Sequence, residues 1–290
     1  SLETGTISRL LDLLRSGDEQ AFRQAAGALH AQELQQIREL ARQEADIIVL
    51  QEGAGMGYAD QVQDLLDNAA LIAQEEQVYI VLPTMAFGPE KPENIVRIID
   101  PSGAIVLEHV KYGGYQFEGS LKGDGILRSV DTPYGRLSAI ICWDADFQHI
   151  VSQAGQQQVD LLFVPANDWF EIKDIHAGMA SFRAVENGMT IFRQAGQGVS
   201  LATDSYGRTL QTLDSFNQKN SASFEAIQII EMTPNAVPTL YPHIGDVFGS
   251  VMQLGALGLV LGLVVSQFWK RSGQGAPGHR GTGEQEILNV

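Results

Sequence analysis

The chain has 290 residues, and 44% of them are hydrophobic, which is enough for one large domain with a sizeable core. Its formal net charge is −16, from 35 acidic and 19 basic residues. This argues against nucleic acid as a partner, because phosphate contacts need a basic surface. The single cysteine, Cys142, excludes an intramolecular disulfide.

Residues 1–45 show only helical patterns. A leucine cluster lies at 10–14, and Asp18 is placed to cap a second helix whose apolar residues recur at helical spacing as far as Leu40. These patterns predict an N-terminal helical segment.

Residues 46–232 alternate between strand and helix patterns, as is typical of an α/β fold. Pro-Ser-Gly and Ser-Tyr-Gly are turn sequences of hairpins, and the glycine-rich stretch 113–125 is predicted to be a functional loop. Helices are predicted over 59–76, 146–156 and 175–187. Strands are predicted over 46–52, 78–85, 94–100, 105–112, 137–141, 161–165, 190–194, 199–203, 210–213 and 227–232.

Cys142 lies where the apolar run Leu-Ser-Ala-Ile-Ile gives way to Asp144, Asp146 and a helical pattern. This predicts a strand that ends in a sharp turn, with the cysteine side chain at the strand tip beside free backbone N–H groups. A lone cysteine is also often a buried small hydrophobe. The position of Cys142, rather than its residue type, makes it a candidate nucleophile.

Glu52 and Lys111 each end a predicted strand. Ligands gather at the carboxyl ends of strands in open α/β sheets. A carboxylate can accept a thiol proton, and an ammonium can lower a thiol pKa and stabilise an oxyanion. Each residue also has a plain interpretation, as a solvated strand-end acid and as an edge charge.

Val247–Trp269 contains no charged residue and is long enough to cross a hydrocarbon core of about 30 Å. Trp269 suits the membrane interface. Lys270 and Arg271 follow, so the positive-inside rule predicts a cytoplasmic tail at 270–290 and an extracytoplasmic domain before the span. A buried core helix is the alternative. The polar, glycine-rich tail is predicted to be disordered and residues 233–246 to be a linker.

Three segments resemble the triad segments of the nitrilase (carbon–nitrogen hydrolase) superfamily. They are Asp-Ile-Ile-Val-Leu-Gln-Glu52, Val-Lys111-Tyr and Ile-Ile-Cys142-Trp-Asp, in the order found in the family. The resemblance implies an α/β fold of the nitrilase type, an αββα sandwich, here followed by one C-terminal transmembrane helix. It implies Cys142 as nucleophile, Glu52 as general base, and Lys111 with the backbone N–H after the cysteine as holders of the oxyanion. It implies no cofactor.

Further segments are similar to the C-terminal part of the apolipoprotein N-acyltransferases, over about residues 45–270. They include Asn167-Asp-Trp-Phe170, the stretch 181–188, and Thr239-Leu-Tyr-Pro-His-Ile-Gly-Asp246, which leads directly into the apolar span. This resemblance implies transfer of a fatty acyl chain to the N-terminal amine of a diacylglyceryl-cysteine lipoprotein through a cysteine thioester. The implied partners are a phospholipid acyl donor, a lipoprotein acceptor and the membrane. The implied location is the extracytoplasmic face of the bacterial cytoplasmic membrane.

The resemblance also suggests supporting residues. Glu118 resembles an extra glutamate that follows the family's lysine, one residue closer here, and would orient Lys111 or Cys142. Trp143 and Asp144 stand where these acyltransferases often have Tyr-Glu, and Trp-Asp is also found among soluble nitrilase amidases.

Trp169 and Phe170 are either core aromatics or the lining of an acyl-chain entry.

The histidines show no metal-binding pattern. His149, His176 and His243 have no metal-ligand spacing with the cysteine or an acidic cluster, so we expect no metal site. Arg183 and Glu186, at i and i+3 of one helix, are expected to form a structural ion pair.

The chain departs from the family in its N-terminal part. The family's sandwich opens with a strand before the first long helix, and its acyltransferases carry several membrane helices ahead of the catalytic domain. Residues 1–45 show neither, so we expect a shortened relative or a piece of a longer membrane protein. Three functions remain compatible: a lipoprotein N-acyltransferase, a membrane-anchored amide- or nitrile-hydrolysing enzyme, and an inactive truncated module.

Overall fold

A computed structural model describes residues 6–115, 118–216, 230–232 and 235–272. The chain divides into two compact units, Ser1–Gly245 and Asp246–Val290, which are described separately.

Two helices, α1 (Thr6–Ser16) and α2 (Glu19–Ala41), open the first unit, as the leucine pattern predicted. Asp18 caps α2, because its carboxylate accepts a hydrogen bond from the N–H of Ala21 at 3.0 Å. Such a bond satisfies one of the four N–H groups that a helix start leaves unpaired. The family's opening strand is not found among residues 6–46 of the described chain.

The first sheet is mixed. Its order is β1-β3-β4-β5, and β2 pairs in parallel with the end of β3. Helix α3 (Ala59–Glu76) has the bounds that its apolar spacing predicted. The β4–β5 hairpin turns at Pro-Ser-Gly, where Gly103 has a φ of +81° that favours glycine. The strands are β1 (Ile47–Val49), β2 (Gly55–Tyr58), β3 (Tyr79–Phe87), β4 (Glu93–Ile99) and β5 (Ile105–Val110).

The second sheet has the order β11-β10-β9-β8-β7-β6. Its central strands β7, β8 and β9 are parallel, so their carboxyl ends lie at one edge. The crossovers carry α4 (Gln148–Gln156) and α5 (Lys173–Asn187). The strands are β6 (Ser129–Thr132), β7 (Gly135–Ala139), β8 (Leu161–Ala166), β9 (Thr190–Ala195), β10 (Val199–Thr203) and β11 (Thr209–Asp214).

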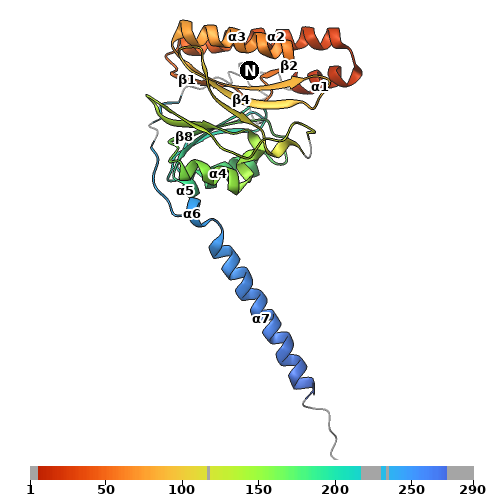
Figure 1. The fold of residues 1–290 in the computed structure, drawn as a ribbon, viewed down its shortest axis with the longest axis vertical. Coiled ribbons are helices and arrows are strands. Elements are labelled where there is room, and N and C mark those ends of the chain that lie inside the picture. Colours follow the sequence, from red (N-terminus) through yellow and green to blue (C-terminus); the bar gives the residue numbers. More distant parts are fainter. Residues whose placement is uncertain (1–5, 116–117, 217–229, 233–234, 273–290) are drawn as a thin grey trace, which may run out of the picture. The chain divides into compact units, whose positions relative to one another are not determined.

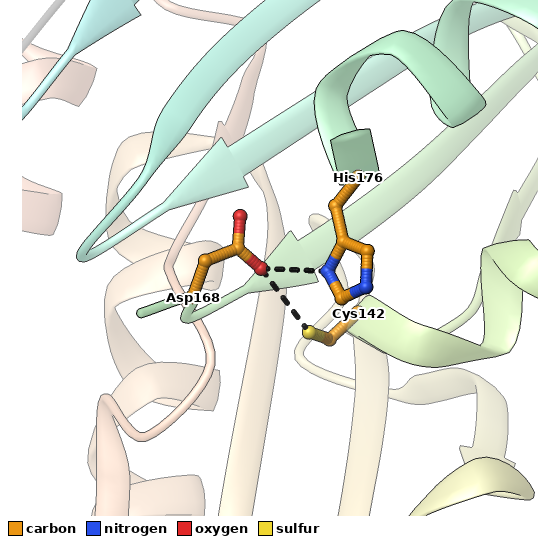
Figure 2. A group of neighbouring side chains, drawn as sticks. All are labelled: Cys142, Asp168 and His176. Atoms are coloured by element: carbon orange, nitrogen blue, oxygen red, sulfur yellow. Dashed lines mark hydrogen bonds and ion pairs between the residues drawn. The ribbon is translucent and has the colours of Figure 1, made fainter. Parts of the chain in front are cut away.

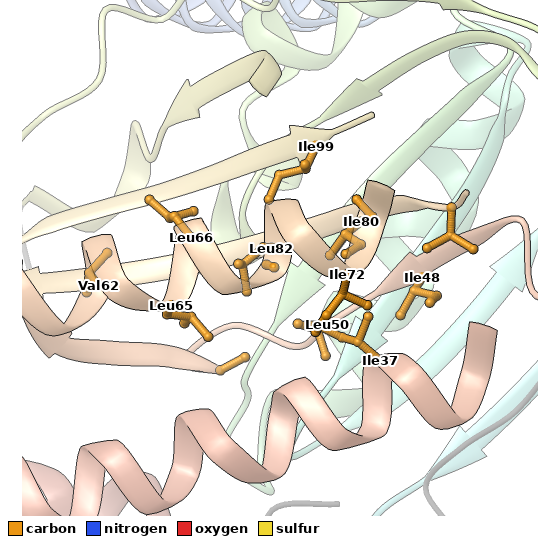
Figure 3. Close-up of a cluster of buried hydrophobic side chains, with 14 residues drawn as sticks. Ile37, Ile48, Leu50, Val62, Leu65, Leu66, Ile72, Ile80, Leu82 and Ile99 are labelled. Carbon is orange, nitrogen blue, oxygen red and sulfur yellow. The ribbon is translucent and has the colours of Figure 1, made fainter. Parts of the chain in front are cut away.

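The layers form the predicted αββα sandwich (Figure 1). Helices α2 and α3 cover one outer face, and α4 and α5 cover the other. Figure 3 shows the cluster under α2 and α3, in which Ile37, Ile72 and Ile80 are fully buried. A second cluster lies between the sheets and includes Val81 from the first sheet and Phe163 from the second. Each such side chain contributes about 1.5–3 kcal/mol when it is buried.

Several boundaries differ from the sequence prediction. The helix expected over 146–156 begins only at Gln148, as α4, and Asp146 is instead the last residue of a 3₁₀ turn, η2 (Cys142–Asp146). No strand forms at 230–232, where the pattern predicts one, and residues 227–229 of that prediction lie outside the described residues. The short strands β2 and β6 were not predicted. A short helix, α6 (Tyr241–Ile244), lies within the predicted linker, and η1 (Gly113–Tyr115) lies within the glycine-rich loop.

The second unit contains helix α7 (Val247–Ser272). Its segment Val247–Trp269 is long and apolar enough to cross a membrane, by length and composition. At 1.5 Å per residue, its 23 residues span about 35 Å. Residues 273–290 of the predicted tail lie outside the described residues.

Candidate active site

Cys142 begins the turn η2, which follows β7 after two residues. The N–H of Ile140 still pairs with the carbonyl of Phe163 at 3.0 Å, and two residues later the backbone turns. Cys142 has a φ of +46°, a conformation that is uncommon for any residue other than glycine. Such strained positions concentrate at functional sites. The sharp turn predicted from the sequence is therefore present.

Asp144 joins this turn to the segment that follows Lys111. Its carboxylate is fully buried. Oδ1 accepts the N–H groups of Tyr112 at 3.0 Å and Gly113 at 2.8 Å. Oδ2 lies 2.8 Å from Nε2 of His109 and accepts the N–H of Ile141 at 3.2 Å. One carboxylate thus fixes the lysine segment to the cysteine turn.

Lys111 lies between two carboxylates and is 1% exposed. Its Nζ donates to Oε1 of Glu52 at 2.7 Å and to Glu118. Asn94 of β4 donates to the same Oε1 of Glu52 at 2.9 Å. Burial alone would lower the pKa of Lys111, but the negative charges of Glu52 and Glu118 raise it overall. The lysine is therefore a fixed cation.

The thiol of Cys142 is protonated at rest. Burial is the main cause that raises its pKa, and Glu52 and Asp168 add to the rise. Lys111 and Arg193 act in the opposite direction. The charges of Glu52 and Lys111 therefore both reach the thiol, which places the three predicted site residues in one location.

The carboxylate of Asp168 contacts the thiol, and Figure 2 shows it together with His176. Sγ of Cys142 donates to Oδ1 of Asp168 at 3.9 Å, a weak hydrogen bond. The same Oδ1 lies 2.9 Å from Nδ1 of His176 on α5. Arg193 of β9 donates to Oδ2 at 2.7 Å. Asp168 is fully buried, and its backbone N–H is bound to the carbonyl of Gln197 at 2.8 Å, so the carboxylate is firmly held.

Asp146 lies at the outer side of this group. Its Oδ2 is 3.6 Å from Nε2 of His176, and its side chain is 28% exposed. Arg183 donates to the carbonyls of Ala145 at 3.0 Å and Asp146 at 3.2 Å. The predicted ion pair of Arg183 with Glu186 is confirmed at 2.5 Å. Through these two carbonyls the arginine also binds the cysteine turn, a contact that the sequence did not indicate.

The aromatic candidates are placed differently. Trp169 and Phe170 are 62% and 57% exposed, so the core interpretation is wrong for both. Phe170 contacts Phe216, with ring centroids 5.4 Å apart. Trp143 is half-buried and its ring lies 5.8 Å from that of Phe147.

His176 has no metal-ligand spacing in the sequence, but the fold brings it close to Cys142 and Asp168. Ligand atoms of Cys142, Asp168 and His176 all lie within 4.8 Å of one another, and N, O and S donors of this kind can bind zinc. Sequence reasoning missed this group because the eight residues from Asp168 to His176 match no ligand spacing. The signal available was the place of Asp168 after a central parallel strand.

Comparisons with known proteins identify the family of the chain. The profile of the carbon–nitrogen hydrolase family matches residues 16–231. A hydrolase of Schizosaccharomyces pombe is 24% identical, over 74% of this chain and 77% of its own. An apolipoprotein N-acyltransferase of Rhizobium rhizogenes is 26% identical over 74% of this chain, and the chain spans 46% of that protein.

Among solved structures, an amidase from Nesterenkonia sp. superposes with a TM-score of 0.59 at 21% identity, covering 65% of this chain and 81% of that one. At this identity the likeness shows the fold. With the profile matching well over half of the residues, the chain belongs to the carbon–nitrogen hydrolase family, the nitrilase superfamily.

Proposed function

We propose that this chain transfers a fatty acyl group from a phospholipid to the N-terminal amine of a diacylglyceryl-cysteine lipoprotein, through a thioester on Cys142. The observation that carries the lipid substrate is the apolar segment Val247–Trp269, which begins two residues after the catalytic unit ends. The similarity to apolipoprotein N-acyltransferases over 74% of the chain supports it. The proposed location is the extracytoplasmic face of the bacterial cytoplasmic membrane.

The first half-reaction would begin with the neutral thiol. Both donors that Glu52 has within the described residues, Lys111 and Asn94, bind Oε1. Oε2 is thus the oxygen that takes the thiol proton. The thiolate attacks the ester carbonyl, and Lys111 with the backbone N–H of Trp143 stabilises the oxyanion. The C–O bond breaks, and Glu52 returns the proton to the lysophospholipid hydroxyl.

The other predicted residues have supporting roles in this proposal. Glu118 shares Nζ of Lys111 with Glu52 and fixes the ammonium between them. Asp144 holds the lysine segment on the cysteine turn. Trp169 and Phe170 lie next to Asp168 in sequence, and their exposed rings suit contact with an acyl chain. No cofactor is required for this chemistry.

A second candidate is a membrane-anchored amidohydrolase. Two similarities favour the amidohydrolase. The match to the Schizosaccharomyces pombe hydrolase covers 77% of that protein, and the fold is similar to that of the amidase. The first half-reaction would be the same, and water would then take the acyl group from the thioester. In the third possibility, an inactive module, the residues of the site are present but no reaction takes place.

One experiment separates the three. The full chain in lipid nanodiscs is incubated with labelled phosphatidylethanolamine, and protein-bound label is measured. We expect a hydroxylamine-sensitive thioester that is absent from Cys142→Ala and passes to a diacylglyceryl lipopeptide with a free amine. Ammonia release from small amides without a lipid thioester would favour the amidohydrolase. Folded protein that forms no adduct with any acyl donor would leave the inactive module.

A further inference from the structure

Asp168 contacts the nucleophile but has no role in the first half-reaction. Its charge raises the thiol pKa, so it opposes thiolate formation. Both of its oxygens accept hydrogen bonds from neighbouring side chains, Oδ1 from His176 at 2.9 Å and Oδ2 from Arg193 at 2.7 Å. A buried carboxylate that opposes the first step is therefore a candidate for a role in the second step.

Acylation changes the hydrogen bonds of Asp168. At rest the S–H of Cys142 is one of the donors to Oδ1. In the thioester the sulfur carries a carbon instead of a proton, so Oδ1 loses this donor. The vacated position lies within about 4 Å of the sulfur, beside the thioester carbonyl. A new N–H donor at this position would be placed for attack on that carbonyl.

The second half-reaction brings such a donor. An α-amine has a pKa of about 7.7–8.0, so at neutral pH the acceptor arrives mainly as an ammonium. Aminolysis needs the free amine, and one proton must therefore be removed before attack. Oε1 of Glu52 already accepts hydrogen bonds from Lys111 and Asn94, and Glu118 accepts one from Lys111. Both glutamates are therefore occupied in binding the lysine.

We propose that Asp168 is the residue that binds the acceptor ammonium and takes its first proton, with His176 and Arg193 as positioning residues. This inference rests on the proposed function. The ammonium donates to Oδ1 in place of the thiol and passes one proton to it. The free amine attacks the thioester carbon, the C–N bond forms and the C–S bond breaks. Glu52 carries a second N–H proton to the thiolate, and Asp168 gives its proton to solvent as the amide leaves.

The charged groups around Asp168 fit this assignment. His176 comes from α5, Arg193 from β9 and Cys142 from η2, and Asp146 faces the other nitrogen of His176 at 3.6 Å. The side chain of Asp168 is 0% exposed, that of His176 14% and that of Asp146 28%. Polar groups thus continue from the buried carboxylate toward solvent.

The test measures the two half-reactions separately in full-length protein in nanodiscs. Asp168→Asn keeps the shape of the side chain but can neither carry the charge nor take the proton. We expect thioester formation from labelled phosphatidylethanolamine to be retained within about threefold. Aminolysis by a lipopeptide amine should fall about 10²-fold at pH near 6.5, in the range of lost general base catalysis. The deficit should shrink to less than about tenfold near pH 9, where the amine is free.

Hydroxylamine provides a second readout, because it is uncharged at neutral pH. It should cleave the thioester of Asp168→Asn as fast as that of the wild type. His149→Gln, a histidine on α4, is the matched control and should leave both half-reactions unchanged. If Asp168→Asn does not fold, His176→Ala tests the same idea, with a smaller loss of aminolysis at low pH and normal hydroxylamine cleavage.

Two results would overturn the inference. One is unchanged aminolysis in Asp168→Asn at low pH. The other is an equal loss with the lipopeptide amine and hydroxylamine at every pH, which would show a structural role. A wild-type protein that forms no lipid thioester would instead refute the proposed function, so the two failures can be told apart.

Discussion

Asp144→Asn, a change of an acid to its amide in the turn η2, should destabilise the fold. The wild-type carboxylate is buried and is bound by four groups: the N–H groups of Tyr112, Gly113 and Ile141, and Nε2 of His109. An amide has only one oxygen to accept with, and its NH₂ group is a donor. Whichever way it is turned, this NH₂ must face backbone N–H donors.

The magnitude follows from the best arrangement of the amide. Its oxygen can accept from Tyr112 and Gly113, and its NH₂ can donate to His109 if the imidazole changes tautomer. The N–H of Ile141 is then left unpaired, and two bonds that were made to a charge are made to a neutral oxygen. A buried unpaired donor costs about 1–3 kcal/mol, and each weakened bond costs up to about 1 kcal/mol. We therefore expect a loss of about 3 kcal/mol.

Thermal unfolding followed by circular dichroism checks this value. For a unit of this size, 1 kcal/mol shifts the Tm by about 2–4 °C, so Asp144→Asn should lower it by about 6–12 °C. Asp131→Asn is the matched control, since that carboxylate is exposed and pairs with Arg136 alone among the described residues, and its Tm should stay at the wild-type value. A Tm of Asp144→Asn within about 2 °C of the control would refute the view that this carboxylate holds the two segments together.

Three further predictions concern charge and backbone. Lys111→Met should raise the thiol pKa of Cys142, because the lysine lowers it, and should reduce the acylation rate by about 10²–10³; unchanged alkylation by iodoacetamide at pH 8 would remove Lys111 from the site. Burial raises the pKa of Glu33 to about 7 from 4.5, so the native state keeps a proton that the unfolded state loses, and stability should fall as pH rises from about 4.5 to 7. Glu33→Gln should abolish this fall, about 3 kcal/mol in all at 1.36 kcal/mol per unit, and melting curves at pH 5 and 8 that keep the wild-type difference would contradict it. Gly188→Ala should cost more than about 2 kcal/mol in chemical denaturation, because φ is +66° and the new Cβ would lie 1.8 Å from the carbonyl oxygen of Val237; a neutral change would show that this segment moves freely.

The sequence was most informative where local chemistry decides the structure. Helix Ala59–Glu76 was predicted with its observed bounds, because apolar spacing along a helix is a local feature. The turn at Cys142 followed from an apolar run that ends at two aspartates. Glu52 and Lys111 were selected as strand-end residues, and the structure brings both close enough for their charges to shift the thiol pKa.

Asp168 and Arg193 were missed because their meeting depends on strand order. Cys142 follows β7, Asp168 follows β8 and Arg193 lies in β9, and these three parallel strands are neighbours in the second sheet. The rule that united Glu52 with Lys111 applies equally to this edge, but only once the order of the strands is known. His176 joins the group through the first turn of α5, whose orientation is set by packing and not by spacing. The exposure of Trp169 is likewise a tertiary property.

The thiol therefore stands between two carboxylate–cation pairs, Glu52 with Lys111 and Asp168 with Arg193. Each pair is close to neutral, so neither supplies the net positive charge that would hold a thiolate in a buried place. Cys142 is accordingly a neutral thiol at rest, and in the proposed reaction its proton passes to Glu52 as the sulfur attacks the substrate carbonyl. Two pairs also provide two separate places for protons, which suits a reaction whose first step moves a thiol proton and whose second step removes an ammonium proton. A hydrolase that uses water needs the first pair alone. Comparing how much Asp168→Asn slows aminolysis of the thioester with how much it slows hydrolysis therefore indicates which of the two reactions this site performs.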